Sequence, residues 1–207
     1  MKKILLPLTF LLGLLLSCAC HRQNEIMPEE VQLSSSGSFL AGHDNNVPRI
    51  ICLSAAGIER KGLLLASVAH ELRALGYETS DRPSEAGYIL QITISGQGLW
   101  QEEAMRLAVE SGYGQKASPT GSGMAGFVAD ALFVQRHVPD ANRPSQKRLK
   151  NISNRNAIAD SQMRFGILGP PPASDHQPDM PDTFINVLAC SLAQAVHEAI
   201  STSRKSG

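Results

Sequence analysis

The sequence lacks an excess of charge of either sign. Its 207 residues include 19 Lys and Arg against 19 Asp and Glu, and only 18% of the residues are charged. Without Lys2 and Lys3, which belong to a predicted export signal, 17 basic residues remain against 19 acidic ones. A nucleic-acid-binding domain carries a clustered surplus of basic residues. We therefore expect no nucleic-acid partner.

Cysteine and aromatic residues are also scarce. Four cysteines are too few for a disulfide scaffold, and aromatic residues make up 5% of the chain. Cys18 and Cys20 lie near the N-terminus, whereas Cys52 falls in a predicted strand and Cys190 in a predicted helix. In an oxidising compartment Cys52 and Cys190 could form a disulfide. The alternative is two separate buried thiols that act as small hydrophobes.

No catalytic or cofactor motif is complete. His70 and His197 are each followed by Glu, as in zinc proteases, but neither has a second histidine four residues later. Gly121–Gly126 fits the pattern G-x-G-x-x-G, yet no strand precedes it, as a dinucleotide site requires. The chain also has no G-x-S-x-G and no P-loop. We expect no cofactor, no metal and no enzymatic activity.

The N-terminus contains an export signal. Lys2 and Lys3 precede Ile4–Leu16, thirteen residues without a charge, which is too short to span a bilayer as a mature helix. The run ends in Leu-Leu-Ser-Cys, which resembles the lipobox of bacterial lipoproteins. That resemblance implies cleavage between Ser17 and Cys18, with diacylglycerol on the Cys18 thiol and an acyl chain on the new amine. The alternative is an ordinary secretory signal with an incidental cysteine.

The predicted lipid defines the organisation of the chain. Two or three acyl chains anchor a protein stably to a membrane, and Ala19, in place of a retaining Asp, implies the outer membrane. Residues 1–17 are the predicted lipoprotein signal peptide. Residues 18–46 are polar and serine-rich, which is typical of a flexible tether. Residues 47–207 are long enough for a single domain with a real core.

Hydrophobic periodicity predicts an α+β fold for this domain. Residues 49–53 form a predicted strand, and residues 58–75 form a helix with an apolar face. A short strand at 77–79 follows, and apolar residues then alternate with polar ones over 88–95, the period of a strand with one buried face. Together these elements make a β-α-β-β unit. Further elements are a helix over 101–110, a strand over 163–168 and a C-terminal amphipathic helix that begins at Asp182.

Between these elements lies a Gly-rich apolar segment, residues 112–138. From Met124 to Val134 it has eleven residues with one charge, Asp130. We predict a helix there, too short to cross a bilayer alone but suited to lying in lipid or against a sister subunit. The residues expected to make that membrane or oligomer contact are Gly121, Gly123, Met124, Gly126, Phe127, Leu132 and Phe133.

Several stretches resemble the TraT family of complement-resistance lipoproteins. They are Val47–Leu53, Leu72–Tyr77 with its Gly-Tyr pair, Ala86–Ile92, Ser111–Gly114 and Gly123–Leu132, in the family's order. The match covers roughly half of the chain. It departs from the family at residues 115–122, where a polar stretch stands in place of much of the first apolar segment.

The resemblance implies a non-catalytic outer-membrane lipoprotein that acts as a homo-oligomer in surface exclusion of conjugation or in complement resistance. It also implies surface exposure, with conjugation or cell-surface components as partners. A second hypothesis is a periplasm-facing lipoprotein that serves as an adaptor or assembly factor of an envelope complex.

Overall fold

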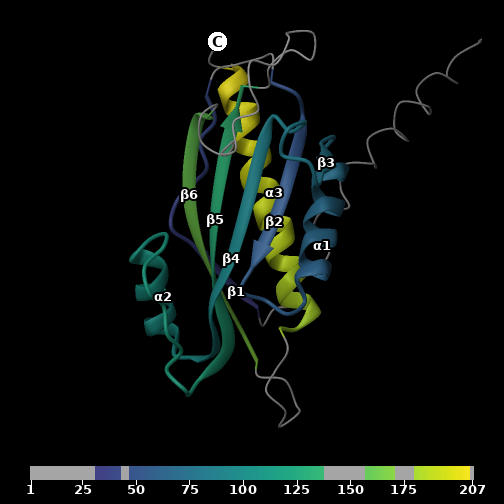
Figure 1. The fold of residues 1–207 in the computed structure, drawn as a ribbon. Coiled ribbons are helices and arrows are strands. Elements are labelled where there is room, and N and C mark those ends of the chain that lie inside the picture. Colours follow the sequence, from purple (N-terminus) through teal and green to yellow (C-terminus); the bar gives the residue numbers. More distant parts are fainter. Residues whose placement is uncertain (1–30, 43–46, 138–156, 171–179, 206–207) are drawn as a thin grey trace, which may run out of the picture. The chain divides into compact units, whose positions relative to one another are not determined.

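The computed structural model describes residues 31–42, 47–137, 157–170 and 180–205. All of them belong to one compact unit, Val31–Gly207. Within these residues the protein has the predicted mixed α+β architecture, with six strands in one sheet and three helices (Figure 1). Across the sheet the strands follow the order β1-β6-β5-β4-β2-β3.

Three long antiparallel strands form the centre of the sheet. They are β4 (Tyr88–Trp100), β5 (Met124–Arg136) and β6 (Ala157–Gly169). On one side β2 (Ile50–Ala56) runs parallel to β4, and the short β3 (Glu78–Ser80) runs parallel to β2. On the other side β1 (Gln32–Ser35) pairs antiparallel with β6 and ends the sheet.

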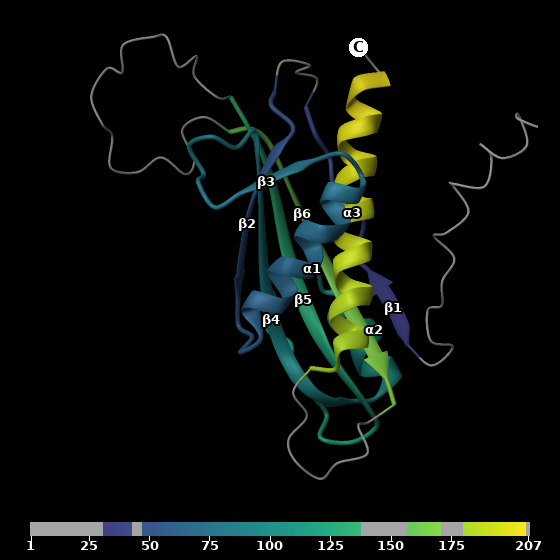
Figure 2. The ribbon, with the colours of Figure 1, turned by 90° about the vertical axis from the view of Figure 1, so that its right-hand side faces the viewer.

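The helices cover the two faces of the sheet unequally. Figure 2 shows α1 (Lys61–Ala74) and α3 (Asp182–Lys205) side by side on one face. The helix α2 (Glu102–Glu110) packs on the opposite face, against β1, β5 and β6. We call the first face the α3 side and the second the α2 side.

The predicted apolar patterns are confirmed in α1 and β4. Leu64, Val68 and Leu72 of α1 are fully buried. Tyr88, Leu90, Ile92 and Ile94 of β4 point into the same core, whereas the alternate residues Gln91 and Thr93 are exposed. The observed helix begins three residues later than predicted, and β4 continues to Trp100.

The C-terminal helix α3 is the longest helix in the described part of the chain. By length and composition its Asp182–Ser203 stretch, with a mean hydropathy of 1.2, would pass as a membrane span. However, 56% of its most apolar eighteen-residue part is buried inside the fold, and the apolar residues of α3 form much of the main core. A long apolar helix can also be the core helix of a domain, and α3 has that role here.

The predicted helix in the Gly-rich apolar segment is wrong: Met124–Arg136 is the strand β5. It lies between β4 and β6, and both of its faces are largely covered. A central strand buried on two faces reads as a continuous apolar run, which periodicity alone does not separate from a buried helix. The core therefore contains Phe127 and Phe133, which we expected to face lipid or a sister subunit.

The predicted tether is also wrong over residues 31–42. Residues Gln32–Ser35 form β1, and Val31 and Phe39 are buried. The Phe39 ring lies 5.4 Å from that of Phe133. Serine-rich composition suggested a flexible linker, but the partner that orders this stretch is β6, more than 120 residues away.

Candidate binding site

The candidate site is built on the edge strand β1. In its register with β6, Leu33 faces Ile167 and Ser35 faces Phe165. Just beyond the strand, the Ser36 N–H donates to the Arg164 carbonyl at 2.9 Å. In an antiparallel pair the residues alternate between those that bond to the neighbour and those whose N–H and C=O point away. The backbone groups of Leu33 and Ser35 therefore point outward, where no other strand of the described chain pairs with β1.

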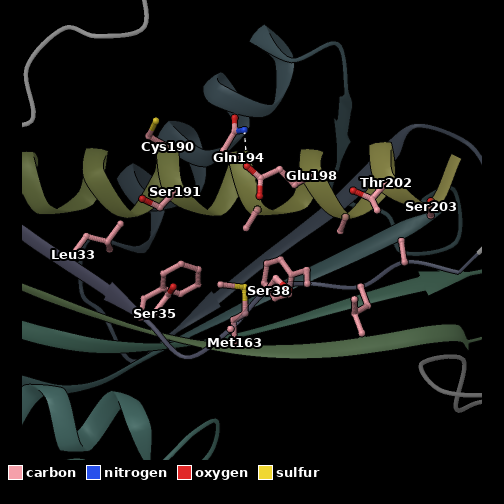
Figure 3. A pocket seen from close by; sticks show the side chains of 17 residues that line it. Leu33, Ser35, Ser38, Met163, Cys190, Ser191, Gln194, Glu198, Thr202 and Ser203 are labelled. Atoms are coloured by element: carbon pink, nitrogen blue, oxygen red, sulfur yellow. Dashed lines mark hydrogen bonds between the residues drawn. The ribbon is translucent and has the colours of Figure 1, made fainter. Parts of the chain in front are cut away.

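On the α3 side of this edge lies a cavity of about 750 Å³, which we call the α3 pocket. Figure 3 shows Leu33 and Ser35 on its strand wall, opposite Cys190 and Ser191 of α3. Its floor is apolar and includes Phe39, Met163, Phe165, Ala195 and Ala199. A cavity of this size that combines an apolar floor with polar groups around it is typical of a binding site.

Hydroxyl and amide groups form the rim of the α3 pocket. Ser191 donates to the Val187 carbonyl at 2.8 Å, so its hydroxyl is held against the helix. The Gln194 amide donates to Glu198 at 2.9 Å. Glu198 is exposed and is the one charged residue among the described residues of the lining. The pocket therefore has a weakly acidic rim over an apolar floor.

On the other face of the same edge lies a second cavity of about 400 Å³, the α2 pocket. Gln32 and Ser34 of β1 line it, together with Glu102, Glu103, Met105 and Arg106 of α2 and with Gly166 and Leu168 of β6. Arg106 bonds to Glu103 and to Glu110, each at 2.5 Å. The hydrogen bond from Arg106 lowers the pKa of Glu103. With Arg106 committed to two carboxylates, this pocket is also acidic.

A buried arginine fixes α2 over the sheet and so shapes the α2 pocket. Arg164 of β6 is fully buried and donates to the Ala108 carbonyl at 3.0 Å, to the Ser111 hydroxyl at 3.0 Å and to the Gln115 carbonyl at 2.6 Å. Its remaining donors bind Asp130 of β5. In the sequence, Asp130 is only an interruption of an apolar run, and no local pattern predicts that Arg164 is its partner.

The polar cluster nearest to catalytic chemistry lies elsewhere, between α3 and β3. His197 accepts or donates at both ring nitrogens, 3.2 Å from the Tyr77 hydroxyl and 3.4 Å from the Ser201 hydroxyl. An activated serine needs a base that is oriented by a third group, usually a carboxylate. Here the third group is the phenol of Tyr77, and none of the three residues lines either pocket. No group of three or more His, Cys, Asp or Glu side chains that could hold a metal ion occurs among the described residues.

The two internal cysteines are separate thiols. Cys52 of β2 is buried and Cys190 of α3 is exposed, and both are free. Burial raises the pKa of both thiols, and a nearby carboxylate adds to the effect, that of Asp81 for Cys52 and that of Glu71 for Cys190. Of the two alternatives that the sequence left open, the disulfide is not formed here and the thiols are separate. The exposure of Cys190 also differs from the predicted pair of buried thiols.

The remaining predicted residues divide into three groups. Cys18 and Ser17 lie outside the described residues. Gly121 and Gly123 have positive φ angles in the approach to β5, and a Cβ on Gly123 would collide with the Trp100 carbonyl. The other five are in β5.

In β5, the predicted contact residues are used inside the domain. Gly126 approaches Ile167 of β6 too closely to allow a Cβ. Phe127 packs 6.2 Å from the Phe184 ring, and Phe133 stacks on Tyr88 at 5.5 Å. Met124 and Leu132 are half-buried. The predicted close approach of small residues is thus real, but its partner is a neighbouring strand.

Comparison with known proteins gives structural likenesses only. No family model and no curated protein matches the sequence. Among solved structures, a PelC dodecamer from Paraburkholderia phytofirmans is similar, with 9% identity and a TM-score of 0.36 over 79% of this chain and 97% of that one. A point variant of that PelC, also a dodecamer, has 13% identity and a TM-score of 0.34 over 82% and 93%. A DUF4136 family protein from Bacteroides thetaiotaomicron has 12% identity and a TM-score of 0.29 over 84% and 96%.

Proposed function

We propose that the protein is a non-catalytic lipoprotein of the bacterial outer membrane whose folded domain binds other protein chains, copies of itself included. The observation that carries this proposal is the open edge of β1 with a pocket on each face of the sheet. Among the residues that the structure describes, neither lining contains a histidine or a lysine that could activate the serine hydroxyls. Such a surface is suited to holding a ligand.

The lipid anchor rests on the sequence Leu15–Cys18. If Cys18 carries the lipid, Cys18→Ala protein will move from the membrane pellet to the soluble periplasmic fraction, whereas the matched control Cys20→Ala will remain in the pellet. The measurement is fractionation of cells followed by immunoblotting. Cys18→Ala protein that stays in the pellet would contradict the anchor.

Two hypotheses describe the cellular role of this lipoprotein. The resemblance to TraT favours a homo-oligomer at the cell surface that acts in surface exclusion or complement resistance. One observation favours a periplasm-facing adaptor instead: Gly123–Leu132, which resembles the membrane-associated part of that family, lies at the start and in the interior of the sheet.

Protease treatment of intact cells separates the two roles. A surface-exposed domain is digested, whereas an inward-facing domain is digested only after the outer membrane is opened. In a mating assay, an exclusion protein lowers the frequency with which its host receives a plasmid, and deletion restores that frequency. Sedimentation velocity in detergent measures the oligomeric state, and a strict monomer would contradict the homo-oligomer.

A further inference from the structure

The two pockets lie on opposite faces of the same strand edge, and Leu33 of β1 lines both. Successive side chains of an extended chain point to opposite faces of a sheet. A strand added beside β1 would therefore direct alternate side chains into the α3 pocket and the α2 pocket. Its backbone would meet the outward N–H and C=O groups of Leu33 and Ser35, as in recognition by strand addition.

We propose that β1 binds an extended segment of another protein, which adds to the sheet as a seventh strand. This names the partner class of the proposed binding function and rests on that function. The segment has apolar residues toward the α3 pocket, with its floor of Phe39, Met163 and Phe165. It has basic or hydroxyl residues toward the α2 pocket, which contains Glu102 and Glu103.

The length of the segment follows from the geometry of α3. The α3 wall of the pocket extends from Cys190 to Ser203, about 20 Å at 1.5 Å per helical residue. An extended chain advances about 3.3 Å per residue, so about six residues fill this length. Glu198 on one rim and the uncommitted carboxylate of Glu102 on the other favour a segment with positive charge.

The probe is the fluorescein-labelled peptide acetyl-Val-Lys-Val-Thr-Val-Lys-amide, titrated by anisotropy against the full-length protein in detergent. Two control peptides test the mode of binding. One has the same composition without alternation, and the other is N-methylated at alternate residues, which removes the donors that face β1. We expect each control to bind at least tenfold more weakly. Equal binding of all three peptides would overturn strand addition.

Two variants of Ser35 distinguish the contribution of its backbone N–H to peptide binding from that of its side chain. Ser35→Pro removes an outward N–H without removing a hydrogen bond to β6, and proline is tolerated at such positions of edge strands. Ser35→Val keeps the N–H. We expect at least a tenfold loss of affinity in the first variant and less than threefold in the second, with unchanged thermal unfolding in both. Equal losses in the two variants would refute backbone pairing.

Two further measurements test the contribution of charge to peptide binding and the place where the peptide binds. Glu102→Lys should weaken binding at least fivefold, whereas reversal of the exposed Glu78 on the far edge strand, Glu78→Lys, should leave it unchanged. Bound peptide should also slow the alkylation of Cys190, because that residue lies on the α3 rim of the α3 pocket. Unchanged alkylation at saturating peptide would place the peptide elsewhere and overturn the proposal.

Two further outcomes show whether the proposed partner or the proposed lipid anchor is wrong. If Ser35→Pro converts an oligomer into monomers and the peptide binds only those monomers or not at all, the edge belongs to a second copy of this chain and the partner proposed here is wrong. Peptide binding is measured in detergent, so release or retention of Cys18→Ala protein from membranes tests the lipoprotein proposal independently. Either proposal can therefore fail while the other stands.

Discussion

Arg164 and Asp130 face each other across β6 and β5 in a two-point ion pair. The Arg164 Nε lies 2.7 Å from Asp130 Oδ1, and Nη2 lies 2.8 Å from Oδ2. Arg164 is fully buried and Asp130 is 7% exposed. The pair is in register in the sheet, and the same guanidinium holds the end of α2 and the loop that follows it. It is therefore an ion pair whose removal affects two layers of the fold.

Loss of one partner leaves the other as an unpaired buried charge. We expect Asp130→Ala and Arg164→Met each to lower the free energy of unfolding by about 3–5 kcal/mol. The double variant should cost clearly less than the sum of the two, because neither charge is then left alone. Urea unfolding of all four proteins measures this coupling. Arg82→Met, which breaks the exposed pair with Glu85, is the control and should cost about 0–1 kcal/mol.

A methyl group at Gly166 would meet the underside of α2. An added Cβ would lie 2.6 Å from Val109 Cγ2, 2.8 Å from Met105 Sδ and 2.9 Å from Ser34 Oγ. Gly166→Ala should therefore destabilise the fold by about 1–3 kcal/mol, because side chains must shift to admit it. Gly62→Ala in α1 meets nothing within 4 Å and should stabilise by about 0.5–1 kcal/mol. Thermal unfolding of the two variants should shift in opposite directions.

The two thiols should differ in reactivity. N-ethylmaleimide should label Cys190 in the folded protein and Cys52 only after unfolding, because Cys52 is buried. The thiolate is the reactive form, and the pKa of Cys190 is raised by burial and by Glu71. Its labelling rate should therefore be below that of a free thiol at pH 7 and should keep rising above about pH 8.5. Peptide mapping without reductant checks the result, and a Cys52–Cys190 disulfide in the native protein would contradict it.

Neighbouring residues of β5 should respond differently to truncation. Phe133 is fully buried between Phe39 and Tyr88, so Phe133→Ala should cost about 3–5 kcal/mol of unfolding free energy. Leu132 points to the α2 side and is half-buried, so Leu132→Ala should cost about half as much or less. Chemical denaturation gives both values. Equal costs would argue that this stretch does not alternate and is not a strand.

The sequence predicted the elements that have a clear period. The face of α1 at Leu64, Val68 and Leu72 and the alternation of β4 are both visible without a structure, because one side of each element is buried and the other is not. In β5 that contrast disappears, since the α2 side is covered by α2 and by the Arg164 side chain. Alanines and glycines in the run then suggested a helix or a lipid contact.

The candidate site was hidden for a different reason. Leu33 and Ser35 form a binding edge only because β6 pairs with β1, and their partners lie more than 120 residues later. The two pockets combine that edge with parts of α2 and α3, so no window of sequence contains either pocket. The nearest signal was the short alternation of Val31 and Leu33 with Gln32 and Ser34, and two alternating apolar residues do not distinguish a strand from a linker.

The position of β1 also sets the reach of the domain from the membrane. The described part of the domain begins at Val31, so if Cys18 carries the lipid, twelve residues lie between the two, against twenty-eight between Cys18 and Val47 in the predicted tether. A fully extended chain covers at most about 3.5 Å per residue. The distance from the Cys18 lipid to Val31 is therefore at most about 45 Å, whereas the longer predicted tether would have allowed about 100 Å. Any partner that adds to β1 must come within that distance of the lipid surface.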